Sequence, residues 1–171
     1  MQSIYFILLC ICSAILYGIV HDQVTARICV EYFTIGHPPV FHTNSPTLLG
    51  LGWGVIATWW VGLMLGVPLA MVARLGKRPK LAPASLARPL AMLLLIMACC
   101  SLLSGIIGYV LARNAVVFLV EPMASAIPAD KRVRFLADLW AHSASYLVGF
   151  VGGVVLIVKT WRRRPRPAVA E

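Results

Sequence analysis

The chain alternates between long runs without a charged residue and short segments that carry nearly all of its charges. The four longest uncharged runs cover residues 1–21, 32–73, 89–112 and 139–158. A helix needs about 20 apolar residues to cross roughly 30 Å of hydrocarbon, so each run is long enough to hold one membrane span. The pattern therefore predicts four spans, at about residues 4–20, 47–73, 90–112 and 140–158.

Four spans leave little of the chain for anything else, since they use about 80 residues at ~20 each. We therefore expect one all-α membrane domain over residues 1–171, built as a four-helix bundle. The composition agrees, because 60% of the residues are apolar and only 12% are charged, about half the charged fraction of a soluble domain. The predicted connections are outer loops at 21–46 and 113–139, a cytoplasmic loop at 74–89 and a cytoplasmic tail at 159–171.

The basic residues predict the orientation. The loop at 74–89 and the tail at 159–171 contain five Lys or Arg each, whereas the other two loops contain one and four. Loops rich in Lys and Arg stay on the cytoplasmic side, so both termini are expected there. This placement accounts for the net charge of +9 without a nucleic-acid partner. The tail arginines either retain the tail inside or bind anionic lipid headgroups; they are Arg162, Arg163, Arg164 and Arg166.

The first and second predicted spans raise separate questions. The first begins Met-Gln-Ser, without the basic start or the cleavage site of a secretory signal, and is read as a retained helix. The second would be roughly 40 Å long as a helix. It must therefore tilt, bend at Pro68 or project from the bilayer.

Small residues recur at four-residue spacing in three of the spans. The clearest series is Gly50, Gly54, Thr58, Gly62 and Gly66. Such stripes let helix backbones approach closely in lipid. They could join two copies of the chain or another membrane protein, but we favour packing within the bundle.

Titratable groups gather on the predicted outer side. All four histidines lie there, and so do five of the six acids, leaving Glu171 inside. Asp138 and His142 are four residues apart and share a helix face, and His21 and Asp22 end the first span at a similar depth.

These four residues are the candidate metal ligands. If the first and last spans are neighbours, His21, Asp22, Asp138 and His142 could hold Zn, Mn or Fe, or Asp138 could orient a ligating His142. The hypothesis requires His21 and His142 to lie within about 12 Å of each other, because ligand bonds are only about 2 Å long. Haem between two histidines at the outer edge is a less favoured reading.

The segment at 24–35 mixes polar and apolar residues and leaves helix and strand open. As a helix it pairs Arg27 with Glu31; as a strand it puts Ile28 and Val30 on one face. Either way it is expected to pack on the outer ends of the spans, as a structural lid or as a binding site. The further outer-loop binding candidates are Arg27, Glu31, His37 and His42.

Part of this region resembles a set of small bacterial four-span membrane proteins. The similarity rests on Tyr17-Gly18-Ile19, His21-Asp22-Gln23 and Glu31-Tyr32-Phe33-Thr34, which follow or end the first span. It covers roughly 20 of the 171 residues. The resemblance implies a multi-pass protein of the bacterial inner membrane and no particular activity.

Three functions remain open from sequence. We favour a non-catalytic accessory or binding component whose outer cluster takes a divalent cation or a proton. The alternative is a membrane enzyme that uses the same cluster to activate water. Thiol redox chemistry is less favoured, because an outer pair of reactive cysteines is missing: Cys29 stands alone there.

Overall fold

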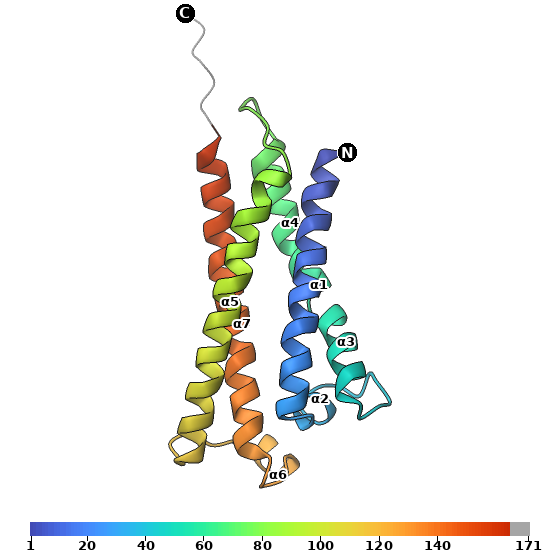
Figure 1. Ribbon diagram of the computed structural model, residues 1–171, viewed down its shortest axis with the longest axis vertical. Coiled ribbons are helices and arrows are strands. Elements are labelled where there is room, and N and C mark those ends of the chain that lie inside the picture. The colour runs from blue at the N-terminus through green and yellow to red at the C-terminus, as the bar shows by residue number, and fades with distance from the viewer. Residues whose placement is uncertain (165–171) are drawn as a thin grey trace, which may run out of the picture.

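The structure is a computed structural model that describes residues 1–164, and it is built from helices (Figure 1). The helices are α1 (Gln2–Ile28), α2 (Glu31–Thr34), α3 (Pro46–Ile56), α4 (Trp59–Arg74), α5 (Ala84–Arg113), α6 (Met123–Ala126) and α7 (Arg132–Arg163). Four helical segments are long and apolar enough to cross a membrane: α1, α3 with α4, α5 and α7. The predicted all-helical class and the four candidate spans are thus confirmed.

The long helices form two groups that lie side by side (Figure 1). In one group α5 packs along α7, and in the other α1 packs along α3 and α4. The groups meet along a seam, where α1 faces α5 and α7 and where α4 faces α7. We call the end that holds α2 and α6 the loop end; the start of α1 and the end of α7 lie at the opposite end.

The packed interior divides into two apolar clusters, one near each end. Phe6, Cys10, Leu69, Leu90 and Leu156 belong to the cluster near the chain termini. Ala26, Phe33, Trp53, Ile127 and Phe135 belong to the cluster at the loop end.

Between the two clusters the long helices expose large apolar side chains outward. Leu102, Leu147 and Phe150 are 65%, 64% and 74% exposed. Soluble monomers rarely expose such contiguous apolar surface, whereas a helix in lipid requires it.

Glycines of the second candidate span bring α1 against α3 and α4. A Cβ at Gly54 would lie 2.6 Å from the Cα of Ile19, and a Cβ at Gly62 would lie 2.6 Å from the Cα of Ile11. The stripe therefore packs within the chain. A second copy could reach these glycines only by displacing α1.

The second candidate span is interrupted at Ala57 and Thr58, between α3 and α4. The hydroxyl of Thr58 donates to the carbonyl of Gly54, as side chains that compete with the helical ladder do. Pro68 instead lies inside α4. The second candidate span is thus broken ten residues before Pro68, a feature that none of the three alternatives (tilt, a bend at Pro68 or projection from the bilayer) predicted.

The segment at 24–35 is helical, which removes the strand alternative. α1 continues eight residues past its predicted end at Val20, and α2 follows after a turn. The turn takes Arg27 away from Glu31, so the expected pair between them is not formed. Arg27 donates to the side chains of Gln23 and Thr47, and Glu31 lies 3.8 Å from the Nζ of Lys131.

Arg164 is turned into the protein instead of toward lipid headgroups. Its side chain is buried, and its guanidinium donates to the carbonyls of Val72, Leu75, Arg78 and Pro79. The last carbonyls of a helix have no partner within that helix, and Arg164 supplies one for the end of α4. The lipid prediction thus rests on Arg162 and Arg163, which are exposed; Arg166 lies outside the described residues.

Candidate metal centre

Three of the four predicted ligands meet at the seam near the loop end. His21 and Asp22 come from α1, and His142 comes from α7. One ligand atom of each lies within 4.8 Å of the others, and the two imidazole centroids are 4.4 Å apart. The separation is far below the limit that the sequence hypothesis required. Asp22 and His142 are 6% and 8% exposed, so both side chains are buried.

His142 is oriented by a backbone carbonyl. Its Nδ1 lies 2.9 Å from the carbonyl oxygen of Asp138, one turn earlier in α7. Because a carbonyl can only accept, Nδ1 carries the proton and the neutral ring keeps its lone pair on Nε2. That lone pair faces Oδ1 of Asp22 at 3.2 Å.

His21 is oriented by a hydroxyl on α5. The Oγ of Ser101 donates to the carbonyl of Ala141 at 3.0 Å, which uses its only proton. It can therefore only accept from Nε2 of His21, which lies 3.2 Å away. This hydrogen bond leaves the lone pair of neutral His21 on Nδ1.

Both rings thus have the arrangement of metal-binding histidines, in which one N–H is held by an acceptor and the other nitrogen is free. Bonds of about 2.1 Å to one ion separate neighbouring ligand atoms by about 3.0 to 3.4 Å at octahedral or tetrahedral angles. The 3.2 Å between His142 and Asp22 falls in this range. The described residues could therefore hold an ion after a small inward movement of His21.

Asp138 does not join the group, which corrects one of the four predicted ligands. Its side chain is 1% exposed, and neither carboxylate oxygen has a hydrogen-bond partner among the described residues. The sequence alternative, in which its carboxylate orients His142, is wrong as well. The carbonyl of Asp138 does this instead, because an i, i+4 imidazole lies over the preceding helical turn.

Aromatic and hydroxyl side chains enclose the three ligands. Tyr32 of α2 stacks on His142 with 4.3 Å between ring centroids and 28° between planes. Burial raises the pKa of Tyr32 well above its ordinary value. Further from the loop end, the hydroxyls of Tyr17 and Ser145 are 2.8 Å apart. α2 therefore covers the site from the loop end.

The other outer-loop candidates lie apart from the three ligands. The Nδ1 of His37 lies 2.8 Å from the carbonyl oxygen of Tyr32, and burial lowers the pKa of His37. His42 is exposed. Arg27 donates to the side chains of Gln23 and Thr47, and Glu31 lies 3.8 Å from the Nζ of Lys131.

The cysteines are free within the described residues. Cys29 is buried, and its thiol is near the carboxylate of Glu31. Burial, with a smaller contribution from Glu31, raises the pKa of this thiol to about 12. A protonated buried thiol is a poor nucleophile.

Sequence reasoning missed the residues that orient and cover the site. Neither Ser101 nor Tyr32 is among the candidate residues predicted from the sequence, although Tyr32 belongs to the segment at 24–35. A polar residue in the third span was the one available signal for Ser101, since buried hydroxyls in lipid need a partner. No protein-family model, curated protein or solved structure matches this chain.

Proposed function

We propose that this is a multi-pass protein of the bacterial inner membrane that binds one divalent cation through His21, Asp22 and His142, on the outer side, as a binding or accessory component. A single observation carries the proposal. Each imidazole has one ring nitrogen held by an acceptor, Nε2 of His142 faces Oδ1 of Asp22 at 3.2 Å, and one ligand atom from each of the three residues lies within 4.8 Å of the others.

Nε2 of His142 and Oδ1 of Asp22 are close enough to share a proton or a cation. The lone pair of His142 Nε2 and the carboxylate of Asp22 face each other at 3.2 Å. Two acceptors at this distance repel each other unless a proton or a cation lies between them. Taking two polar groups out of water without compensation is costly, so occupancy of this position would stabilise the protein.

The ligand set indicates which cations fit. Two imidazole nitrogens and one carboxylate oxygen suit Zn, Mn or Fe, whereas Mg and Ca prefer oxygen ligands alone. Zinc is the first choice, because it binds histidine and aspartate at four-coordinate sites. Haem fits poorly: with imidazole centroids 4.4 Å apart, a porphyrin has no room between the rings.

A cation here would connect the two helix groups. His21 and Asp22 belong to α1 and His142 to α7, so one ion bonds across the seam. Three protein ligands also leave a coordination position for water, as in catalytic zinc sites. We favour binding over catalysis because the ring of Tyr32 covers His142 from the loop end, the side from which a water-soluble substrate would approach.

The test is elemental analysis of the protein purified in detergent, with zinc, manganese or iron supplied separately. We expect about one equivalent of zinc in the wild type and a large loss in His142→Ala and Asp22→Asn. His42→Ala is the matched control, since His42 is an exposed histidine outside the cluster. It should keep the full content.

Two results would contradict the proposal. One is wild-type protein that binds no cation at micromolar concentration. The other is cation content that is lost equally in His42→Ala. In the first case, a pH-dependent infrared band from Asp22 that disappears in His142→Ala would identify the position as a proton site instead.

A further inference from the structure

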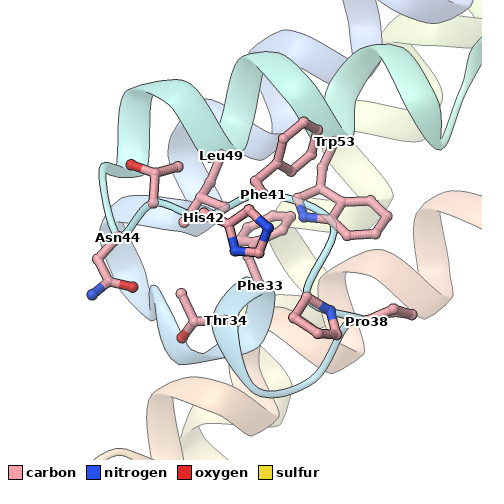
Figure 2. Close-up of a pocket in the computed structure, with 10 residues that line it drawn as sticks. Phe33, Thr34, Pro38, Phe41, His42, Asn44, Leu49 and Trp53 are labelled. Carbon is pink, nitrogen blue, oxygen red and sulfur yellow. The ribbon is translucent and has the colours of Figure 1, made fainter.

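A pocket of about 380 Å³ opens at the loop end, between α2, α3 and the segment at 35–45. Its volume is within the usual range for small-molecule sites. Figure 2 shows ten of the residues that line it, and none of the three candidate metal ligands is among them. The pocket is thus separate from the proposed cation site.

The walls of the pocket are flat. Three aromatic side chains line it, those of Phe33, Phe41 and Trp53, together with the apolar ring of Pro38. Phe41 and Trp53 meet edge to face, with centroids 5.7 Å apart. Aromatic walls of this kind bind planar rings by stacking, so the shape selects a flat ligand.

The polar groups of the pocket point to a neutral ligand with acceptor oxygens. No Asp, Glu, Lys or Arg lines it, and its polar side chains include Thr34, His42 and Asn44. Figure 2 shows the indole nitrogen of Trp53 on the side of the ring that faces His42. Trp53 is only 7% exposed, and no acceptor for its N–H is found within residues 1–164. The indole N–H is therefore available to a group that enters the pocket, and a ligand oxygen could accept from it.

The helix that carries Leu49 and Trp53 of the pocket also has exposed apolar side chains. Leu48, Leu51 and Val55 of α3 are 55%, 43% and 41% exposed, and α3 begins a candidate membrane span. A ligand whose ring occupies the pocket could therefore place an apolar tail along α3.

We propose that this pocket binds the headgroup of a quinone: a neutral planar ring with two carbonyl oxygens and an apolar tail. One oxygen accepts from the indole N–H of Trp53. His42 and Asn44 at the mouth hold the polar edge of the ring, and Phe33 and Phe41 pack on its faces.

The experiment measures equilibrium binding of ubiquinone-1, a short-tailed benzoquinone, to the full chain in lipid nanodiscs, against empty nanodiscs. We expect saturable binding to the wild type. Trp53→Phe keeps an aromatic ring but removes the donor, and should weaken binding about tenfold. Asn44→Trp adds bulk at an exposed position where folding is not at risk, and should abolish binding. Trp60→Phe is the control, because Trp60 is an exposed tryptophan outside the pocket.

Further measurements separate this proposal from its alternatives. His142→Ala should bind ubiquinone-1 as the wild type does, because the cation site is separate. Naphthalene, which is flat but has no acceptor oxygen, should bind at least tenfold more weakly. The proposal is overturned if binding does not exceed that of empty nanodiscs, if Asn44→Trp binds normally, or if naphthalene competes as well as the quinone.

Discussion

Nε2 of His142 lies 3.2 Å from Oδ1 of Asp22, although 120 positions of the chain separate the two residues. The contact joins α7 to α1, which belong to different helix groups. Because the hydrogen bond to Asp138 fixes the ring of His142, the distance is set by the position of two whole helices. A cation or proton that binds between these two atoms therefore connects the two helix groups.

The first prediction is that zinc stabilises the seam. A ligand that binds only the folded state adds about 2.7 kcal/mol at 100 times its dissociation constant. Zinc should therefore raise the thermal midpoint of the chelator-treated wild type in detergent. Asp22→Asn should show no such rise, whereas His42→Ala should match the wild type. A rise of equal size in Asp22→Asn would place the stabilising cation elsewhere.

The second prediction concerns the unpartnered carboxylate of Asp138. Burial disfavours the charged form of a carboxyl group, so a buried Asp must at neutral pH either keep a costly charge or take up a proton, whereas an amide needs neither. Asp138→Asn should therefore stabilise the metal-free protein by about 1–3 kcal/mol at neutral pH. Zinc content should stay near that of the wild type, since Asp138 is outside the ligand group. Asp130→Asn, at an exposed position, should change stability by less than about 0.5 kcal/mol.

A loss of zinc in Asp138→Asn would contradict the second prediction. It would mean that the carboxylate of Asp138 turns toward the ion when the ion binds.

The all-helical class was predictable because a segment in lipid must satisfy its backbone hydrogen bonds internally, which few structures other than a helix do. Uncharged runs of about 20 residues permit few structures other than spanning helices, and the four runs gave the four candidate spans. The ends of the helices were harder to predict from sequence: α1 reaches Ile28 and α7 begins at Arg132. The helices continue past the uncharged runs into segments with charged residues, and these residues ended the predicted spans early.

The candidate site was predictable only as far as helix spacing allows. Residues 21 and 22 and residue 142 were placed at one depth from the span ends, but their convergence needed α1 beside α7, which no local pattern contains. Asp138 shows the limit of the spacing argument. A position four residues from His142 shares its face, yet the side chain of Asp138 does not reach the ligand group.

The third prediction tests packing through the glycine stripe. A Cβ at Gly62 would meet the backbone of Ile11 at 2.6 Å, whereas one at Gly149 would meet only the flexible end of Met97, at 3.0 Å. Gly62→Ala should therefore destabilise the protein by about 1–3 kcal/mol, and Gly149→Ala should cost less. Denaturation in mixed detergent measures both. Equal stability of Gly62→Ala and the wild type would mean that α1 and α4 are further apart than described.

The fourth prediction is a pH dependence at the loop end. Burial lowers the pKa of His37, so the folded segment resists a proton that the unfolded segment accepts near its ordinary pKa of about 6.5. Stability of this segment therefore falls as the pH drops through that value, and it levels off below the lowered folded pKa. Hydrogen exchange of residues 31–37 in chelator-treated protein, corrected for intrinsic rates, should speed up several-fold between neutral and mildly acidic pH.

His37→Phe separates this effect from other acid-sensitive groups. The variant keeps a ring against Phe33 and Trp53, which stack on or contact His37 at 5.4 and 4.6 Å between centroids, but it has no proton to gain. Its exchange at residues 31–37 should lose most of the pH dependence, while His42→Phe should keep it. If His37→Phe retains the full dependence, the acid-sensitive group is another one and the prediction is wrong.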